Sequence, residues 1–207
     1  MRSLLLAAIA AAVLAASAGA SNPALLHPSK LNATAPATYK AKFTTTKGAF
    51  VITVYRKWSP RGADRFYNLV ANGFYDGQRL FRDVPGQFLQ WGISGDPKVS
   101  KAWLNATIKD DPFKVSNIPA TVDFATSGPN TRTTQVFVNL GSNTFLDTQG
   151  FTPFGRVTSD MTAIAKLYHG YGDKPTNEQP QMYEQGEKFF AKSFPKLDRI
   201  LTARIVH

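Results

Sequence analysis

FRDVPGQFLQ at residues 81–90 and ATSGPNTRTTQVF at residues 125–137 are the stretches that decide the fold and the candidate site of this chain. Each stretch places a polar side chain two residues away from an aromatic one. The pairs are Phe88 with Gln90 and Gln135 with Phe137. Because side chains two apart on a strand point to the same face, we expect both pairs to line one surface.

Arg82 lies in the first stretch, close enough along the chain to face the same surface. Such a surface combines an apolar floor with two amides and one guanidinium. It suits the binding of a peptide that contains proline, and it does not suit hydrolysis. The histidines at positions 27, 169 and 207 form no ligand cluster, so we expect no catalytic zinc.

These stretches resemble the signature of the cyclophilin-type peptidyl-prolyl isomerases. The resemblance runs from about residue 39 to residue 206 and is dense up to residue 167. The supporting stretches read GADRFYNLV at 62–70, GFYDG at 73–77, FLD at 145–147 and FGRV at 154–157. Several separate motifs in the family's order make a specific match, unlike one short pattern.

The first half of the chain has the periodicity of two strands followed by a helix. Apolar residues alternate with others in residues 39–43 and 50–54, and residues 47–48 read as the turn between these two expected strands. Ser59 and Pro60 are typical of a helix start, with serine as N-cap and proline at the first helical position.

The second half predicts another helix, from about Asp160 to Tyr168. Leu201, Ala203 and Ile205 alternate with polar or small neighbours, as in a final strand. This pattern alone does not separate a barrel from a sandwich. The resemblance implies a mainly β fold, a closed eight-stranded antiparallel β-barrel that is capped by two α-helices.

The N-terminus differs in composition from the rest of the chain. Arg2 precedes an apolar run that ends in the small residues AGA at 18–20, as in a secretory signal peptide. We therefore expect a signal peptide at 1–20, a flexible lead segment at 21–38 and the cyclophilin-like isomerase domain at 39–207. Export would lead to a periplasmic, luminal or extracellular location. An uncleaved N-terminal anchor is the alternative.

Composition predicts one globular domain. The 207 residues are 43% hydrophobic and 18% charged, and their net charge of +10 comes from scattered lysines and arginines. That pattern favours a solvated basic surface over a specific nucleic-acid site. The absence of cysteine from the sequence excludes disulfides and a thiol nucleophile. We expect a monomer whose partners are unfolded or flexible proline-containing polypeptides, without stable membrane insertion after signal removal.

The resemblance also implies which residues form the site. Arg82 is the expected catalytic residue, and no cofactor or metal is expected. The expected substrate-binding residues are Phe88, Gln90, Ala125, Thr126, Gln135, Phe137, Phe145, Leu146 and Phe151. Among these, the pocket for the proline ring would be formed by Phe88, Phe137 and Leu146. Gln90 and Gln135 would hold the substrate backbone or orient the arginine, and the backbone near residues 125–126 would pair with the extended peptide.

Several positions depart from the family pattern. Gln87 falls where cyclophilins usually carry a pocket phenylalanine, so either Phe88 takes over that apolar role or the pocket is wetter and weaker. Thr126 replaces a common asparagine. Phe145 stands where cyclosporin-sensitive members have tryptophan, so we expect weak cyclosporin binding. Phe151 lies near the usual position of a pocket histidine.

Residues 170–195 are the least family-like part of the chain. They combine a loop rich in glycine and proline with Phe189, Phe190 and Phe194 among lysines. One interpretation is a basic, aromatic contact site for a membrane or a partner. The other, which we favour, is a loop and short helix whose aromatic side chains pack on the barrel.

Three functional hypotheses follow. The first is an exported peptidyl-prolyl cis-trans isomerase that assists protein folding without a cofactor. The alternative is a non-catalytic module or chaperone that binds proline-containing peptides, which the polar Gln87 keeps open. A third hypothesis, a barrel that binds a small ligand inside, predicts an interior cavity.

Overall fold

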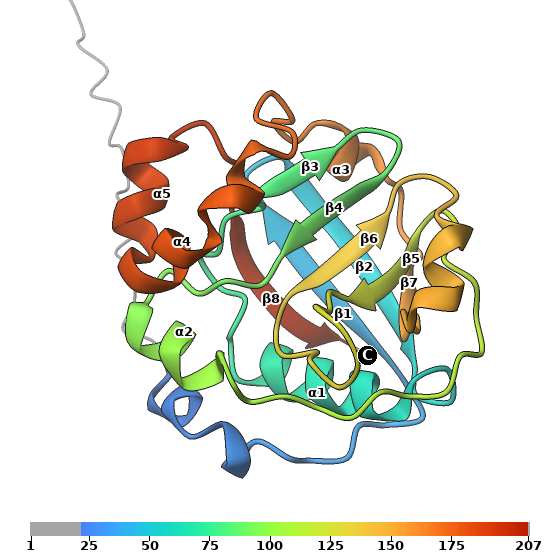
Figure 1. Ribbon diagram of the computed structural model, residues 1–207. Coiled ribbons are helices and arrows are strands. Elements are labelled where there is room, and N and C mark those ends of the chain that lie inside the picture. Colours follow the sequence, from blue (N-terminus) through green and yellow to red (C-terminus); the bar gives the residue numbers. More distant parts are fainter. Residues whose placement is uncertain (1–21, 207) are drawn as a thin grey trace, which may run out of the picture.

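The computed structural model describes residues 22–206 (Figure 1). Within that range, eight antiparallel strands form one curled sheet in the order β3-β4-β6-β5-β7-β2-β1-β8. The strands are β1 (Thr38–Thr45), β2 (Gly48–Tyr55), β3 (Arg82–Val84), β4 (Phe88–Trp91), β5 (Thr121–Phe124), β6 (Val136–Asn139), β7 (Gly155–Val157) and β8 (Ile200–Val206). The expected mainly β architecture with eight antiparallel strands is confirmed as a curled half-barrel.

Helices lie at both ends of the sheet and along one side. The α-helices are α1 (Pro60–Ala71), α2 (Pro97–Trp103), α3 (Thr162–Ala165), α4 (Gln179–Gln185) and α5 (Glu187–Ser193). Short 3-10 turns are η1 (Pro23–Leu26), η2 (Pro28–Lys30), η3 (Thr144–Gln149) and η4 (Lys174–Glu178). Figure 1 shows α1 at one end of the sheet and α3 at the other. This arrangement is consistent with the expectation that two α-helices cover the ends of the fold.

The edge strands of the sheet are β3 and β8. The segments that precede them meet at an isolated antiparallel bridge between Arg79 and Arg199. Beside this bridge, the backbone N–H of Leu80 donates to the carbonyl of Asp198 at 3.1 Å. The two edges therefore approach each other at one end through a short stretch of pairing rather than a full ladder.

The hairpin of β1 and β2 confirms the alternation in the sequence. Phe43 pairs with Phe50 and Ala41 pairs with Ile52, and all four side chains are buried. The rings of Phe43 and Phe50 stack with 5.2 Å between centroids, and Trp91 of β4 meets Phe43 edge-on at 5.5 Å. These side chains fill the inside of the curled sheet, so the described residues do not support an internal ligand cavity.

Helix α1 begins at Pro60 as predicted, but the side chain of Ser59 does not cap it. The Ser59 hydroxyl instead donates to Asp111 Oδ2 at 2.6 Å. Asp111 accepts hydrogen bonds from the backbone N–H of Arg61 at 3.1 Å and of Gly62 at 3.0 Å. A carboxylate from a distant segment therefore satisfies the free N–H groups at this helix start.

The second predicted helix is shorter than expected. The sequence predicts a helix from about Asp160 to Tyr168, whereas α3 spans only Thr162–Ala165. Ile164 and Leu167 are buried as the pattern predicts. The helix does not reach Tyr168, whose backbone N–H donates to Asp198 Oδ2 at 2.7 Å instead of to a helical carbonyl.

The final strand is confirmed as β8, with one deviation from simple alternation. Leu201 is 47% exposed, while Ile200 and Ala203 face the core. Two adjacent residues of β1 pair with Thr202 and Ile200, so the register shifts at this point. Leu201 is the extra residue of a β-bulge, which reverses the direction in which the following side chains point.

Residues 170–195 fold into η4, α4 and α5, and their aromatic residues pack on residues that flank strands β3 and β4. Phe190 and Phe194 are buried in a second apolar cluster together with Phe81. Arg79 is buried beneath this segment and donates from Nη2 to Glu187 Oε1 at 2.6 Å. The interpretation that the aromatic side chains pack on the barrel is confirmed.

The N-terminal part of the chain includes a difference from the sequence-based expectation. The sequence predicts a flexible lead segment at 21–38, yet in its described part Leu25 is buried and its carbonyl accepts a hydrogen bond from Trp103 Nε1 at 2.8 Å. Asn68 Nδ2 likewise donates to the Ala33 carbonyl at 2.7 Å. The signal peptide expected at 1–20 lies outside the described residues. In the described range, no helix has both the length and the apolar character needed to cross a membrane.

Candidate active site

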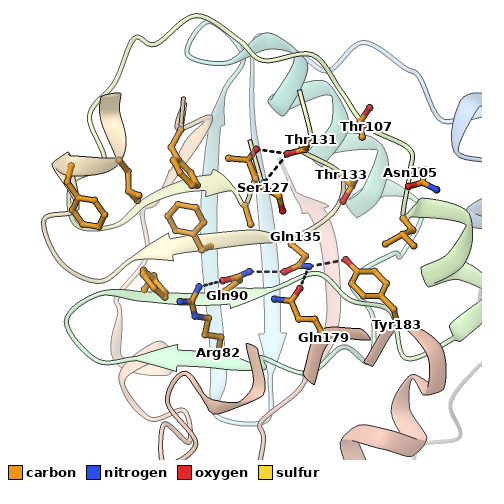
Figure 2. A pocket seen from close by; sticks show the side chains of 18 residues that line it. Arg82, Gln90, Asn105, Thr107, Ser127, Thr131, Thr133, Gln135, Gln179 and Tyr183 are labelled. Atoms are coloured by element: carbon orange, nitrogen blue, oxygen red, sulfur yellow. Dashed lines mark hydrogen bonds between the residues drawn. The ribbon is translucent and has the colours of Figure 1, made fainter. Parts of the chain in front are cut away.

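One cavity of about 610 Å³ collects the residues that the sequence analysis selected (Figure 2). The expected site residues that line it are Arg82, Phe88, Gln90, Ala125, Thr126, Gln135, Phe137, Phe145, Leu146 and Phe151. The additional lining residues are Leu104, Asn105, Thr107, Ser127, Thr131, Thr133, Gln179 and Tyr183. The structure therefore brings every expected site residue to one place.

The strand pleat sends alternate side chains of β4 to the cavity and to the core. Leu89 and Trp91 belong to the main core cluster, whereas Phe88 and Gln90 line the cavity. Strand β6 repeats this arrangement, because Phe137 lines the cavity between two valines that face the core. The expected common face of the two stretches is thus confirmed.

Arg82 is placed by the pairing of β3 with β4. It lies opposite Gln90 in the antiparallel register, and its Nη1 donates to Gln90 Oε1 at 2.9 Å. The guanidinium carbon lies 4.2 Å from the centroid of the Phe88 ring, a cation–π contact. Its Nε donates to Asp173 Oδ1, which lies just before η4. Three neighbours therefore hold the guanidinium at the cavity wall.

A chain of amide hydrogen bonds continues from Arg82 across the cavity floor (Figure 2). Gln90 Nε2 donates to Gln135 Oε1 at 2.7 Å. Gln135 Nε2 then donates to Gln179 Oε1 at 2.8 Å and to the hydroxyl of Tyr183 at 2.9 Å. Since Gln90 contacts the guanidinium directly, the geometry favours an orienting role for this glutamine.

The apolar half of the cavity is built from aromatic edges and faces. Phe88 and Phe137 meet edge-to-face with 6.1 Å between centroids, and Phe137 meets Phe151 in the same way at 5.8 Å. Leu146 is buried beside them, whereas Phe145 is 59% exposed at the rim. This arrangement makes a compact apolar pocket next to the guanidinium.

Gln87 does not enter this pocket. Its backbone N–H donates to the Val84 carbonyl at 2.9 Å within the turn that joins β3 to β4, and its side chain does not line the cavity. Phe88, the next residue, supplies the aromatic ring. The geometry therefore agrees with the interpretation in which Phe88 takes over the apolar role.

The loop before β6 forms the opposite wall. The backbone N–H of Ala125 donates to the Gln135 carbonyl at 2.9 Å, which ties the loop to its own end. The hydroxyls of Thr126 and Thr131 lie 2.8 Å apart and hydrogen-bond within the loop. In the structure, the Thr126 hydroxyl thus stabilises the loop, and the asparagine that the family usually has at this position is absent.

Arg65 of α1 holds two of the cavity walls together from below. Its Nη1 donates to the carbonyl of Ala106 at 2.6 Å and to that of Thr133 at 3.1 Å, and its guanidinium lies over the ring of Trp103. Burial lowers the pKa of Arg65 to about 10, so this side chain remains charged at neutral pH. It therefore supports the cavity without lining it.

The cavity contains very few groups that could exchange a proton. Among its lining residues, the ionisable ones are Arg82 and Tyr183. Burial raises the pKa of Tyr183, which the hydrogen bond from Gln135 opposes, so the phenol stays protonated at neutral pH. Within residues 22–206, no three His, Cys, Asp or Glu side chains are grouped to hold a metal ion. The cavity suits binding and charge stabilisation.

The sequence reasoning missed cavity residues both inside the second quoted stretch and in other segments. Ser127, Thr131 and Thr133 lie inside the second quoted stretch, so the hydroxyl groups of that stretch were a usable signal. Gln179 and Tyr183 lie in α4, within the least family-like segment, where no local pattern marks a site. They enter the cavity because α4 packs against α2 and buries Met182 beside Phe81 and Ile93.

Known proteins of one family are similar to this chain. The family described as cyclophilin type peptidyl-prolyl cis-trans isomerase/CLD matches residues 40–186. A peptidyl-prolyl cis-trans isomerase-like 1 of Gibberella zeae is 30% identical over 140 residues, which are 65% of this chain and 86% of the relative. A peptidyl-prolyl cis-trans isomerase of Acinetobacter baylyi is 30% identical over 143 residues, 66% and 76% of the two chains.

A solved structure agrees with the architecture. The cyclophilin type peptidyl-prolyl cis-trans isomerase of Cryptosporidium parvum superimposes with a TM-score of 0.62 at 17% identity, covering 82% of this chain and 98% of the other. That likeness establishes the cyclophilin fold. With the family match over most of its length, the chain belongs to the cyclophilin-type peptidyl-prolyl cis-trans isomerases. Members of this family act on proline-containing peptides.

Proposed function

We propose that this chain catalyses rotation about X-Pro peptide bonds in client polypeptides, with Arg82 as the catalytic residue. The observation that carries the proposal is the placement of one guanidinium beside an apolar pocket that can hold a proline ring. The Arg82 guanidinium lies 4.2 Å from the Phe88 centroid, and Phe137 and Leu146 line the same cavity.

The chemistry of the reaction explains why this arrangement is sufficient. Rotation about a peptide bond has a barrier of roughly 18–20 kcal/mol, because amide resonance is lost. No bond between heavy atoms breaks, so neither a nucleophile nor a metal is required. Catalysis needs stronger binding of the twisted amide than of the planar one. In the twisted state the prolyl nitrogen is pyramidal and more basic, and a fixed donor such as Arg82 stabilises it.

The other expected residues have supporting roles in this proposal. Phe88, Phe137 and Leu146 hold the proline ring, with Phe151 behind them and Phe145 at the rim. The backbone of residues 125–126 pairs with the extended peptide beside the pocket. These assignments rest on the shared cavity and on the edge-to-face packing of its rings.

Three further points belong to the proposal. We interpret the Arg79–Arg199 bridge as the closure of the half-barrel into a complete barrel, since it joins the segments next to both edge strands. The signal-peptide pattern of residues 1–20 supports export to a periplasmic, luminal or extracellular space. We also propose that the mature protein acts as a monomer.

The proposal is tested by following cis-to-trans relaxation of an Ala-Pro peptide without a coupled protease. The mature protein and its Arg82→Ala variant are compared at equal concentration, with circular dichroism to confirm that both fold. We expect acceleration by the parent and its loss in the variant, with only a modest loss of peptide binding. A folded parent that binds the peptide without acceleration would instead establish a non-catalytic proline-binding module.

A further inference from the structure

The segment from Asp173 to Tyr183 lies along one side of the cavity, and we call it the strap. It runs through η4 and into α4. Phe81, the residue before Arg82, and Met182, the residue before Tyr183, are both fully buried in the second apolar cluster. Shared burial of these neighbours packs the strap beside β3 and places Arg82 and Tyr183 at the same cavity.

One end of the strap contacts Arg82. Asp173 Oδ1 accepts a hydrogen bond from Arg82 Nε and a second one from the hydroxyl of Thr176, at 3.1 Å. The Thr176 contact orients the carboxylate towards the arginine. Asp173 precedes η4, but its side chain does not cap that turn. Its carboxylate is therefore bound by Arg82 and, within η4, by the hydroxyl of Thr176 alone.

The other end of the strap receives the last hydrogen bonds of the amide chain (Figure 2). Gln135 Nε2 donates to Gln179 Oε1 and to the Tyr183 hydroxyl. An arginine can only donate, so its bond to Gln90 Oε1 decides which way the Gln90 amide faces. The orientation of the Gln90 amide in turn decides which way the Gln135 amide faces. Two acceptors on the strap, Gln179 Oε1 and the Tyr183 hydroxyl, receive the last hydrogen bonds of this series.

We propose that the strap holds this series at both ends and that Asp173 is a positioning residue for Arg82. This inference rests on the proposed function of the cavity. A free arginine side chain has about 2 kcal/mol of rotamer entropy to lose. Asp173 at Nε and Gln90 at Nη1 restrict it before substrate arrives. Among the described residues, Nη2 has no hydrogen-bond partner, which leaves a donor for the prolyl nitrogen.

Asp173 has two opposite effects on the reaction rate. It positions the guanidinium, which speeds the reaction, and it neutralises part of the positive charge, which slows it. The exposure of Asp173 decides which effect is larger. The Asp173 side chain is 62% exposed, so water screens its charge. The hydrogen bond to Nε still restricts the direction of the guanidinium. Positioning therefore outweighs the loss of positive charge, and removal of the carboxylate is expected to slow the reaction.

The test compares Asp173→Asn with Glu184→Gln. Both substitutions remove one negative charge from neighbouring parts of the C-terminal segment, but Glu184 is exposed on α4 and does not line the cavity. In the relaxation assay we expect Asp173→Asn to lower kcat by about two- to fivefold with little change in KM, as for the loss of one exposed charged contact. Glu184→Gln is expected to leave both constants unchanged.

Salt gives a second readout that a merely structural role would not change. High salt shortens the Debye length to about 3 Å and weakens exposed ion pairs. We expect kcat of the parent to fall towards that of Asp173→Asn as salt increases, while the variant stays constant. Equal salt dependence of the two proteins, an unchanged kcat in Asp173→Asn or a higher kcat would each overturn the positioning role.

A spectroscopic measurement separates this inference from the proposed function. The Nε–H resonance of Arg82 in the folded parent, assigned with Arg82→Ala, is expected to be shifted by the carboxylate and protected from solvent exchange. Asp173→Asn should weaken both effects, because a neutral amide oxygen accepts a weaker hydrogen bond than a carboxylate, whereas Glu184→Gln should keep them. An inactive parent would contradict the isomerase proposal, while an Arg82 resonance that ignores Asp173→Asn would contradict the pairing itself.

Discussion

Arg132 and Asp111 form an ion pair in which neither side chain is exposed to solvent, with 3.2 Å between Nη2 and Oδ2. Arg132 lies in the loop that forms one cavity wall, and Asp111 accepts hydrogen bonds from the start of α1. Hydrogen bonds from Ser59, Arg61 and Gly62 lower the pKa of Asp111 against the opposing effect of its burial. The pair thus joins the loop to the helix that covers the end of the sheet.

Removal of the buried cation should destabilise the protein strongly. We expect Arg132→Met to lower the free energy of unfolding by about 3–5 kcal/mol, because it removes the buried cation of Asp111 and leaves this carboxylate only the half-exposed Arg61 as a partner. Arg61→Met is the matched control, since Arg61 is half exposed and pairs with the same carboxylate at 3.4 Å. It should cost less than about 1 kcal/mol. If urea unfolding gave the same loss of unfolding free energy for both variants, burial of the ion pair would not determine its contribution to stability.

Charge and geometry of the catalytic arginine can be separated by Arg82→Lys. Lysine keeps the positive charge, but it lacks the planar fork that contacts Gln90 and Phe88 together. We expect kcat to fall by about 100-fold, as when one fixed donor of a transition-state site is lost. KM for an Ala-Pro peptide should change little. A lysine variant with the full kcat would mean that a positive charge alone is enough.

Stability should depend on pH through Asp83, which is buried on the face of β3 opposite Arg82. Burial raises its pKa to about 6, with nearby His169 lowering it and Asp198 raising it. Because the folded state holds this proton more tightly than the unfolded chain, unfolding free energy should fall as pH rises from about 4 to about 6.

Asp83→Asn should remove that dependence. At pH 7.5 the variant is expected to be more stable than the parent by about 2–3 kcal/mol, and the difference should vanish near pH 4. Urea unfolding across this pH range measures both quantities. Parallel pH profiles of the two proteins would show that another group is responsible.

Cyclosporin binding should respond to the residue at position 145. Phe145 lies on η3 at the cavity rim and is 59% exposed, so a tryptophan has room at this position. Its indole N–H adds one donor, and a typical hydrogen bond corresponds to about five- to tenfold in affinity. We expect Phe145→Trp to bind cyclosporin more tightly than the parent by that factor in calorimetry. Equal affinities would place the cause of weak binding elsewhere in the pocket.

Local periodicity was sufficient for much of the fold. The alternation in residues 39–43 and 50–54 predicted the hairpin of β1 and β2, because a strand with one buried face must repeat every two residues. The same rule put Phe88 with Gln90 on the cavity side of β4. The common face of each pair followed from residues close together in the chain, whereas the roles of the site residues were expected from the resemblance to the family.

Other features depended on contacts that local patterns do not encode. The Ser59 side chain does not cap α1 because Asp111, from a distant segment, occupies that position. Leu201 is exposed because the register of β8 shifts against β1. Neither outcome is visible in the periodicity of the segment concerned, since each depends on the partner that the fold places beside it.

The sequence by itself determined the family and the strands that carry the site. It also named ten of the residues that line the cavity. Only the tertiary structure showed that Asp173 binds Arg82 and that Tyr183 accepts a hydrogen bond from Gln135. The physical reason is the range of the interactions. Strand faces follow from neighbours along the chain, whereas the strap reaches the site only after its apolar residues pack against those beside β3 and β4.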